Sequence, residues 1–132
     1  MPKTVLLVDD DPEFLTALSP LLNTAGYSVI TAKDAKEARS VQDDHRVFIS
    51  AAIIDLELPE IGGFQIIGEL ARTQKRPIPI MAVTGIYNDV HLEVAEYLAA
   101  KISIRKPKPS RPLTLIVDGL KVLTSKPPAT QI

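Results

Sequence analysis

Four short apolar runs are the most regular feature of the hydrophobic pattern, and polar residues follow each of them. The runs are Val5–Val8, followed by Asp9, Asp10 and Asp11; Ala51–Ile54, followed by Asp55; Ile80–Val83, followed by Thr84 and Gly85; and Ile102–Arg105, followed by Lys106 and Pro107. Apolar runs of this length that alternate with helical stretches are typical of buried parallel strands joined by helices. Because the carboxyl ends of parallel strands lie along one edge of a sheet, we expect these polar residues to meet there.

Between the runs, apolar residues recur at the spacing of amphipathic helices, and local signals mark where these helices begin and end. Pro12 is tolerated in the first turn of a helix, and Gly26 supplies the stop of that helix. Pro20 lies inside it, where a proline costs about 3 kcal/mol, so we expect a kink one turn upstream. Asp34 and Ser110 are expected to cap the second and the fifth helix.

The complete pattern predicts five strands that alternate with five helices. The strands are expected at about residues 4–9, 27–31, 51–55, 79–83 and 102–105, and the helices at about 12–25, 34–43, 63–74, 89–100 and 110–124. This alternation predicts an α/β domain with a doubly wound parallel sheet. We assign residues 1–124 to the domain and residues 125–132, which contain two consecutive prolines, to a flexible C-terminal tail.

Composition narrows the class of protein. The chain has 132 residues, enough for one domain, and 45% of them are hydrophobic, which excludes a disordered chain. Its 15 basic and 16 acidic residues leave a net charge of −1 without a basic stripe, so we expect no direct binding of nucleic acid. The absence of cysteine excludes thiolate catalysis, and the isolated His45 and His91 do not make a zinc site. The apolar stretch near the N-terminus is too short for a signal peptide or a membrane span, so we expect a cytoplasmic protein without membrane association.

Asp9, Asp10 and Asp55 would bring three negative charges into one small space. Carboxylates that close cannot all stay ionised unless a cation neutralises them. Oxygen ligands, few in number and with room left for water and substrate oxygens, suit Mg²⁺ better than zinc or calcium. The predicted sheet edge is therefore a candidate site for Mg²⁺ and a phosphoryl group.

The other polar residues at this edge fit the chemistry of phosphoryl transfer. Asp55 closes its strand alone, which makes its carboxylate the natural nucleophile for an acyl phosphate. Lys106 would offer a point charge to one phosphoryl oxygen, and Thr84 a hydroxyl donor to another. Each residue alone also has an ordinary explanation, such as helix capping by the aspartates or a solvated loop around Lys106. Their joint placement at strand ends disfavours that explanation.

As a set, these motifs resemble the receiver domain of two-component response regulators. The resemblance covers about residues 3–124 and rests on Val-Asp-Asp-Asp-Pro at 8–12, Ile-Asp-Leu-Glu-Leu-Pro at 54–59, Gly63, Val-Thr-Gly at 83–85 and Arg-Lys-Pro at 105–107. It implies a flavodoxin-like (βα)5 fold with strand order 2-1-3-4-5. It also implies a signalling domain, not an enzyme, that takes a phosphoryl group from a histidine kinase or a histidine phosphotransferase and assists its own phosphorylation and dephosphorylation.

The resemblance also implies a role for each residue at the sheet edge. Asp55 resembles the phosphoacceptor, Thr84 the switch residue and Lys106 the phosphate-binding residue. The implied ligands of Mg²⁺ are Asp10 directly, Asp9 through water, Asp55, and the backbone carbonyl of Glu57. The family further implies a cis peptide bond between Lys106 and Pro107.

Three features depart from the family pattern. Ser103 stands where the family has Tyr or Phe, whose ring moves when the threonine engages phosphate, so that rotamer switch is absent or replaced. Gly62 replaces the Asp or Asn that caps the third helix, and residues 108–112 are richer in proline than is typical.

Glu57 and Ile86 flank the path of an attacking water. Because Ile86 has no group to orient a water, we expect a persistent acyl phosphate, while Glu57 could hold a water or repel the phosphoryl group.

The output is expected on the face formed by the fourth helix, the fifth strand and the fifth helix. Helical spacing puts one buried stripe on the fifth helix, made of Leu113, Ile116, Val117, Leu120 and Leu123, with Leu115 and Val122 on the opposite side. On the fourth helix, Val90, Val94, Tyr97 and Leu98 share one face, and Leu92 and Ala99 point away. The residues expected to contact an unknown downstream protein, or a second copy of the chain, are Leu92, Ser103, Leu115 and Val122.

Two other functions remain open at this point. One is a Mg²⁺-dependent phosphatase with an aspartyl-phosphate intermediate, although its nucleophile normally ends the first strand whereas Asp55 ends the third. The other is a receiver-like docking module that does not switch, which would require the loss of acceptor, metal or lysine positions that are all present. Whether the chain is complete or part of a longer protein is left open as well.

Overall fold

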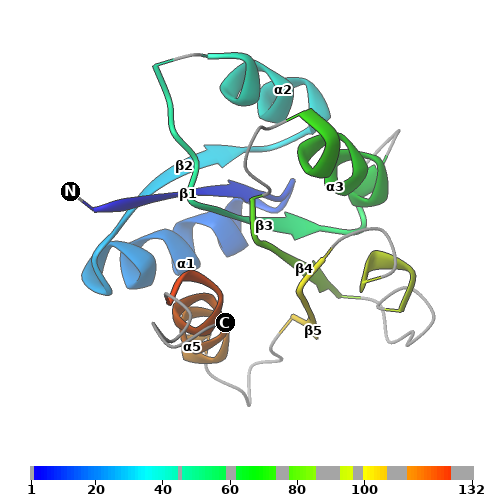
Figure 1. Ribbon diagram of the computed structural model, residues 1–132. Helices are drawn as coiled ribbons and strands as arrows, with labels where there is room; N and C mark the ends of the chain where they lie inside the picture. The colour runs from blue at the N-terminus through cyan, green and yellow to red at the C-terminus, as the bar shows by residue number, and fades with distance from the viewer. Residues whose placement is uncertain are drawn as a thin grey trace, which may run out of the picture.

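The computed structural model of the chain describes residues 2–44, 46–58, 62–73, 78–85, 93–96, 100–106 and 113–125. Its strands are β1 (Lys3–Val8), β2 (Tyr27–Ala32), β3 (Ala51–Asp55), β4 (Ile80–Thr84) and β5 (Ile102–Arg105). Its helices are α1 (Pro12–Thr24), α2 (Ala35–Asp43), α3 (Gly62–Thr73) and α5 (Thr114–Thr124), and residues 93–96 form a further helical turn (Figure 1). These elements follow the predicted order, and α5 is the one that begins clearly later than predicted.

The five strands form one parallel sheet in the order β2-β1-β3-β4-β5. Leu7 pairs with Ile53 and Ile54 pairs with Ala82, so the carboxyl ends of β1, β3 and β4 lie level with one another. Helices α1 and α5 cover one face of the sheet, and α2 and α3 cover the other (Figure 1). This arrangement confirms the predicted doubly wound, flavodoxin-like fold.

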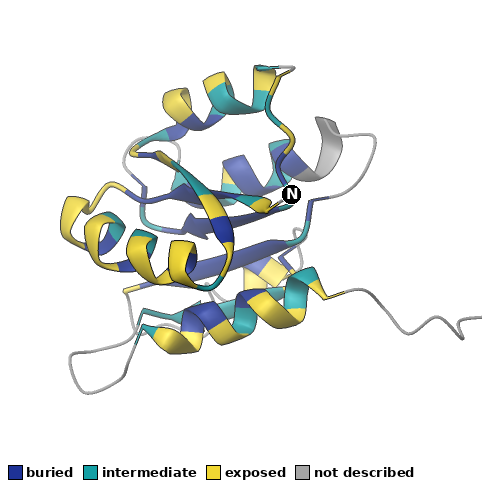
Figure 2. Cartoon of the chain, turned by 90° about the vertical axis from the view of Figure 1, so that its left-hand side faces the viewer, coloured by how far each residue is buried: buried dark blue, intermediate teal, exposed yellow. Residues whose placement is uncertain are grey.

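The core consists of two layers, one on each face of the sheet. Along β1, Leu6 and Val8 belong to the layer under α2 and α3, and Val5 and Leu7 belong to the layer under α1 and α5. All four side chains are fully buried, and Figure 2 shows the central strands in the colour of buried residues. A strand that is buried on both faces has to be apolar at successive positions, which explains why uninterrupted apolar runs mark these strands in the sequence.

The end of α1 and the start of α2 follow the predicted signals, whereas α5 begins after Leu113 without a side-chain cap, later than the predicted cap at Ser110. Asp34 caps α2 by accepting a hydrogen bond from the backbone N–H of Glu37 at 2.8 Å. Gly26 lies just after α1 with φ +100°, a left-handed conformation that favours glycine. Asp11 caps α1 by accepting from the backbone N–H of Glu13 at 3.0 Å. Within the described part of the chain, no helix is both long enough and apolar enough to cross a membrane.

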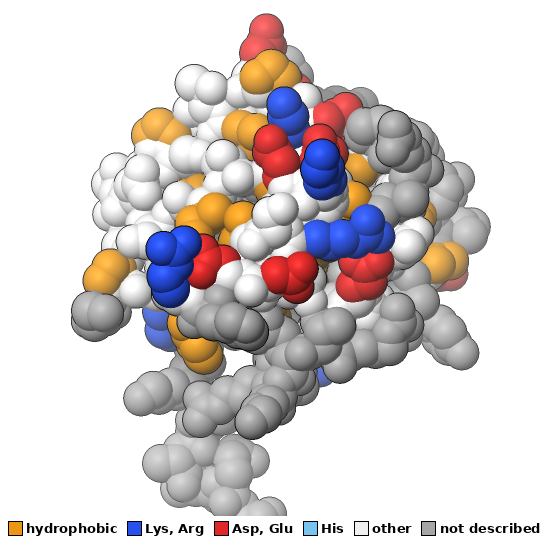
Figure 3. All heavy atoms as spheres, turned by 90° about the horizontal axis from the view of Figure 1, so that it is seen from above, with side chains coloured by type: hydrophobic (Ala, Val, Ile, Leu, Met, Phe, Trp, Pro, Cys, Tyr) orange, Lys and Arg blue, Asp and Glu red, His pale blue; other side chains and the backbone are white. Residues whose placement is uncertain are grey.

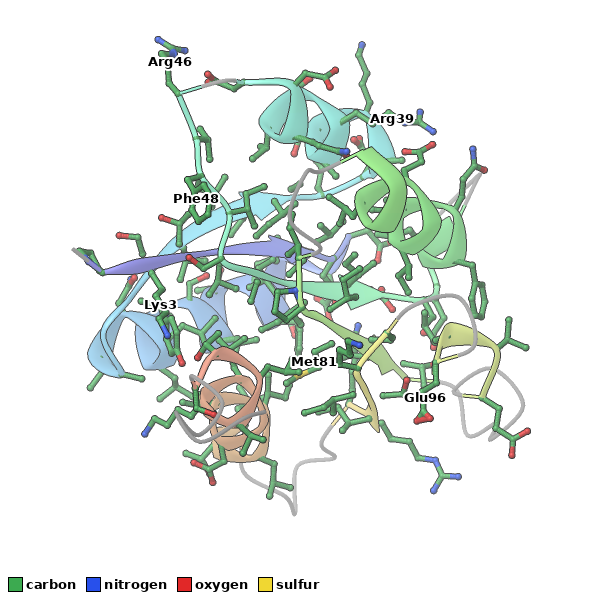
Figure 4. All side chains as sticks on the ribbon, viewed as in Figure 1. Lys3, Arg39, Arg46, Phe48, Met81 and Glu96 are labelled. Atoms are coloured by element: carbon green, nitrogen blue, oxygen red, sulfur yellow. The ribbon has the colours of Figure 1, made fainter. Side chains whose placement is uncertain are left out.

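Helix α5 has the predicted inner and outer faces. Ile116 and Leu120 are fully buried, whereas Leu115 and Val122 are 48% and 69% exposed. The inner face packs closely on the sheet, and Met81 of β4 points toward α5 (Figure 4). Next to it lies Gly119, where a Cβ atom would come within 2.9 Å of the methionine Cε, so the helix approaches the strand here because glycine lacks a side chain.

The predicted faces of the fourth helix were wrong at Val94. In the helical turn 93–96, Val94 is 42% exposed, whereas Ala95 is fully buried in the core. Two adjacent apolar residues compete for the inner face here, and the smaller one packs against the core. Most of the predicted fourth helix, including Leu92, lies outside the described residues, as do the cap predicted at Ser110, the peptide bond before Pro107, and Ile86.

Helices α2 and α3 are joined at the surface by an ion pair between Arg39 and Glu69. The guanidinium donates from Nε to Oε2 at 3.0 Å and from Nη2 to Oε1 at 2.7 Å, and Figure 4 shows Arg39 between the two helices. Acidic and basic side chains are interspersed over the face that carries these helices (Figure 3). The described part of this face therefore mixes both signs of charge and forms no basic stripe.

Candidate functional site

Three of the predicted polar residues are buried at the carboxyl edge of the sheet. Asp9 follows β1, Asp55 ends β3 and Thr84 ends β4, and none is more than 1% exposed. Among the residues that the structure describes, these are the polar or charged ones that are buried. Burial of a carboxylate is costly unless the charge is paired, so two buried acids at one edge need partners or a function.

Asp9, Asp10 and Asp55 form one acidic cluster. Each contributes a carboxylate oxygen, and these three oxygens lie within 4.8 Å of one another. The backbone N–H of Asp11 donates to Oδ1 of Asp9 at 2.9 Å, and the backbone N–H of Glu57 donates to Oδ1 of Asp55 at 3.0 Å. Since α1 is capped by Asp11, the ordinary explanation of helix capping applies to that residue and not to the cluster.

Lys106 is the cation that faces this cluster. Its Nζ lies 2.8 Å from Oδ2 of Asp9 and 3.5 Å from Oδ2 of Asp55. The backbone N–H of Lys106 donates to the carbonyl of Thr84 at 2.7 Å, so the hydrogen bonds between β4 and β5 continue up to the lysine and direct its backbone along the sheet edge. The structure thus brings together the acids and the lysine that the sequence placed at separate strand ends.

Phe14 of α1 is a further residue of the site, which the polar motifs at the strand ends do not indicate. The Nζ of Lys106 lies 4.7 Å from the centre of its ring, within the range of a cation–π interaction. Helical spacing predicts that Phe14 is buried, and it is. Which side chain it contacts depends on how α1 crosses the strand ends, and the spacing carries no information on that crossing.

The charges in the site do not balance among the described residues, because one lysine faces three carboxylates. The pKa of Asp55 is raised to about 6, chiefly by burial and also by the charge of Asp9, while the backbone N–H of Glu57 and the ammonium of Lys106 oppose the shift. Burial lowers the pKa of Lys106, but its contacts with Asp9 and Asp55 outweigh burial and raise that pKa above its usual value. Both directions follow from the crowding of several carboxylates around one lysine.

The acidic cluster has the donor set of a divalent-cation site. It offers carboxylate oxygens from Asp9, Asp10 and Asp55, and Asp10 is exposed, which leaves the cluster open to solvent on one side. Oδ2 of Asp9 is buried and, apart from its ion pair with Lys106, has no hydrogen-bond partner among the described residues. Hard cations such as Mg²⁺ and Ca²⁺ prefer oxygen ligands of this kind.

Thr84 makes a contact that the sequence pattern does not predict. Its hydroxyl donates a hydrogen bond to Oε1 of Glu57, the half-buried residue two positions after Asp55. Next to Thr84, a Cβ atom at Gly85 would lie 3.3 Å from Oε2 of Glu57, so the glycine leaves room for this carboxylate. The prediction for Glu57 concerned its backbone carbonyl, whereas the contact that the structure adds is made by its side chain.

Two glycines let α3 begin directly beside the end of β3. A Cβ atom at Gly63 would overlap the carbonyl oxygen of Asp55 and lie 2.8 Å from its carbonyl carbon. Gly62 has φ +70°, a conformation that side chains rarely adopt. The sequence suggested only a weak helix cap at Gly62, and the structure adds a backbone reason for glycine at this position.

Ser103, which stands in place of the aromatic switch, faces inward. It lies on β5 opposite Ala82, and its Oγ is buried without a hydrogen-bond partner among the described residues. Its hydroxyl is therefore not available on the surface, which argues against the predicted contribution of Ser103 to a contact with a downstream protein.

A comparison with known protein families decides what kind of domain carries this site. The family model of the response regulator receiver domain matches residues 5–118. The chain belongs to this receiver family. Among curated relatives, the receiver is similar to the response regulator GtcR of Aneurinibacillus migulanus, with 35% identity over 107 residues that cover 81% of this chain and 43% of GtcR. The chain thus spans less than half the length of this relative.

Solved receivers have the same fold. The chemotaxis response regulator CheY4 of Vibrio cholerae is 27% identical with a TM-score of 0.78, covering 93% of this chain and 99% of that one. A response regulator of Burkholderia pseudomallei, solved with a phosphorylated aspartic acid, a calcium ion and citrate, is 24% identical with a TM-score of 0.77, covering 92% of this chain and 66% of that one. At 24% identity, the likeness to the Burkholderia pseudomallei protein supports the fold alone.

Proposed function

We propose that this receiver domain accepts a phosphoryl group on Asp55 in a Mg²⁺-dependent reaction and then changes its contacts with other proteins. The donor is a histidine kinase or a histidine phosphotransferase, and the reaction takes place in the cytoplasm. The observation that carries the proposal is the convergence of three carboxylates on one lysine at the sheet edge, with the buried Asp55 at its centre.

The arrangement suits an in-line displacement at phosphorus. An oxygen of the Asp55 carboxylate forms the new bond to phosphorus, while the bond from phosphorus to the imidazole nitrogen of the donor breaks and its electron pair stays on that nitrogen. With its pKa at about 6, Asp55 is largely ionised at neutral pH and is therefore competent as the nucleophile. Lys106 offers its ammonium to a phosphoryl oxygen without moving far, because it already lies 3.5 Å from Oδ2 of Asp55.

The metal ligands in this proposal are the carboxylates of Asp9, Asp10 and Asp55 and the backbone carbonyl of Glu57. When bound, Mg²⁺ supplies positive charge that offsets both the acidic cluster and the phosphoryl oxygens. The chain itself contributes the fixed positions of these oxygens, which lie at the ends of two neighbouring strands.

Intact-mass measurement tests the proposal. Incubation with acetyl phosphate and Mg²⁺ is expected to add one phosphoryl group to the wild-type protein, and none to Asp55→Asn or in the presence of EDTA. Asp43→Asn, which changes an exposed aspartate at the end of α2, is the matched control and should be phosphorylated like the wild type. An adduct that survives both Asp55→Asn and EDTA would contradict the assignment.

The outer face of α5 is the proposed contact surface for the downstream partner. Leu115 and Val122 are seven positions apart and lie on the same side of the helix, where both are exposed. The double variant Leu115→Glu with Val122→Glu is expected to be phosphorylated normally but to lose the protein that the phosphorylated wild type retains in a pull-down. Lys121→Glu, on another side of α5, is the control, and equal retention by the double variant would place the contact elsewhere.

A further inference from the structure

The hydrogen bond between Thr84 and Glu57 joins a hydroxyl and a carboxylate that must separate during the proposed phosphorylation. The sequence motifs assign to Thr84 a further role in that reaction, in which its hydroxyl donates to a phosphoryl oxygen on Asp55. A hydroxyl has one hydrogen to donate, and in this structure it points to Oε1 of Glu57. Donation to the phosphoryl group therefore requires that the bond to Glu57 is broken first.

The surroundings of Glu57 keep its carboxylate inside the site. Its backbone N–H donates to Oδ1 of Asp55 at 3.0 Å, so the residue starts directly beside the acceptor. The other carboxylate oxygen lies next to Gly85, where a Cβ atom would be only 3.3 Å from Oε2 of Glu57. A carboxylate that accepts from Thr84 and fills the space over a glycine is held in a defined position.

The charge of Glu57 adds to the crowding of acids. It is a fourth carboxylate beside Asp9, Asp10 and Asp55, and it contributes to the raised pKa of both Asp55 and Lys106. A phosphoryl group on Asp55 adds further negative charge at the point where the Glu57 side chain already faces the acceptor. Repulsion and the loss of its hydrogen-bond donor then act on the same side chain and in the same direction.

We propose that the Glu57 side chain is a latch that holds the Thr84 hydroxyl in the unphosphorylated domain and is expelled when Asp55 is phosphorylated. This inference rests on the proposed function, because it concerns how phosphorylation of the same site is resisted and read out. The threonine keeps its proton throughout, and only the acceptor changes, from the Glu57 carboxylate to a phosphoryl oxygen. The expelled side chain supplies the moving group, since Ser103 has no ring to follow the threonine inward.

The latch predicts that removal of Glu57 accelerates phosphorylation. Glu57→Ala removes both the acceptor and the charge, and we expect the rate with acetyl phosphate at saturating Mg²⁺ to rise about tenfold, the factor that corresponds to a hydrogen bond with a charged group. Glu57→Gln keeps an acceptor oxygen without the charge and is expected to lie between Glu57→Ala and the wild type. Glu96→Ala, which removes an exposed acid of the helical turn 93–96 (Figure 4), should leave the rate unchanged.

The same substitution in a Thr84→Ala background separates a latch from simple repulsion. Without the hydroxyl there is nothing to hold, so Glu57→Ala should accelerate phosphorylation clearly less in this background than in the wild type. An equal acceleration in both backgrounds would overturn the latch and leave Glu57 acting by charge alone.

The thermal midpoint of the unphosphorylated variants provides a test that does not depend on phosphorylation. Glu57→Ala and Thr84→Ala are each expected to remove the same hydrogen bond, so the midpoint of the double variant should be higher than the sum of the two single changes predicts. Strict additivity would show that the two side chains are not coupled, which overturns the latch. If the two side chains are coupled but the wild type takes no phosphoryl group on Asp55, both the proposed function and the latch fail. If they are coupled, the wild type is phosphorylated normally and Glu57→Ala is not phosphorylated faster, only the latch is overturned.

Discussion

The ion pairs made by Arg39 and by Lys106 both join a basic side chain to carboxylates, but they differ in burial and in charge balance. Arg39 and Glu69 pair one cation with one anion at the surface between α2 and α3, through two hydrogen bonds of good geometry. Lys106 faces the buried Asp9 and Asp55, with Asp10 nearby, so one cation meets three anions. The first pair fastens two helices together. The second leaves an excess of negative charge among the described residues, and such an excess favours the binding of a cation.

The two pairs should respond very differently to the loss of their cation. Lys106→Ala leaves Asp9 and Asp55 buried without an opposite charge, and we expect it to lower the free energy of unfolding by about 3 kcal/mol. Arg39→Ala removes the cation of a surface pair and is expected to have a much smaller effect. Urea titrations of both variants in the presence of EDTA measure the difference, and equal losses would show that the two pairs do not differ in the way described.

Removal of an anion should change the free energy of unfolding in opposite directions at the two sites. Because burial and the charge of Asp9 raise the pKa of Asp55 from 3.8 to about 6, the ionised carboxylate destabilises the folded state. Asp55→Asn is therefore expected to raise the free energy of unfolding at pH 7, by at most about 3 kcal/mol at 1.36 kcal/mol per unit of pKa. Glu69→Gln, in contrast, breaks a favourable pair and should lower the stability slightly.

The same shift predicts how this gain depends on pH. The folded state binds the proton of Asp55 more tightly than the unfolded state does. The destabilisation of the folded state by the ionised carboxylate is therefore absent below the unfolded pKa of about 4, and it grows until the pH passes about 6. The charged groups that face Asp55 are Asp9, Asp10, Glu57 and Lys106. In metal-free buffer, the difference between Asp55→Asn and the wild type should be large at pH 7 and small at pH 4. A difference independent of pH would contradict the assignment of the effect to ionisation.

Mg²⁺ should stabilise the site and leave the surface pair unaffected. A ligand present at ten times its dissociation constant stabilises the folded state by about 1.4 kcal/mol. We expect a corresponding rise in the thermal midpoint of the wild type and of Glu69→Gln, and no rise for Asp10→Asn. A rise of equal size in Asp10→Asn would mean that Mg²⁺ binds elsewhere.

The smallest predicted effect concerns the ring that holds the lysine. Phe14→Leu keeps an apolar residue under Lys106 but removes the cation–π contact at 4.7 Å, which is worth about 0.5–1 kcal/mol. A double-mutant cycle with Lys106→Met separates this term from the loss of packing around the ring. Strictly additive effects of the two substitutions would show that the ring and the ammonium do not interact.

The sequence predicted the fold and most of the site because both depend on strand ends. A strand buried on both faces leaves an apolar run in the sequence, so Asp9, Asp55 and Thr84 could be located as the first polar residues after such runs. Parallel pairing then places those residues at one edge whatever their separation along the chain. Asp34 and Gly26 were predictable for a similar reason, since the cap and the stop of a helix depend on local backbone geometry.

Side-chain contacts between separate loops could not be predicted in this way. The bond from Thr84 to Glu57 depends on the direction of two side chains, and neither residue type requires that partner. The contact of Phe14 with Lys106 depends on how α1 crosses the sheet. Val94 was assigned to the wrong face because periodicity alone does not decide between two adjacent apolar residues in a short helical segment.

The most direct test of the account is to locate the phosphoryl group on the chain. After incubation with acetyl phosphate and Mg²⁺, rapid digestion under acidic conditions and tandem mass spectrometry identify the modified residue. The account predicts that the phosphoryl group is on Asp55, the buried acid of the unbalanced cluster, and that the signal disappears when EDTA replaces Mg²⁺. A phosphoryl group on any other residue, or one on Asp55 that forms equally well in EDTA, would contradict the central claim.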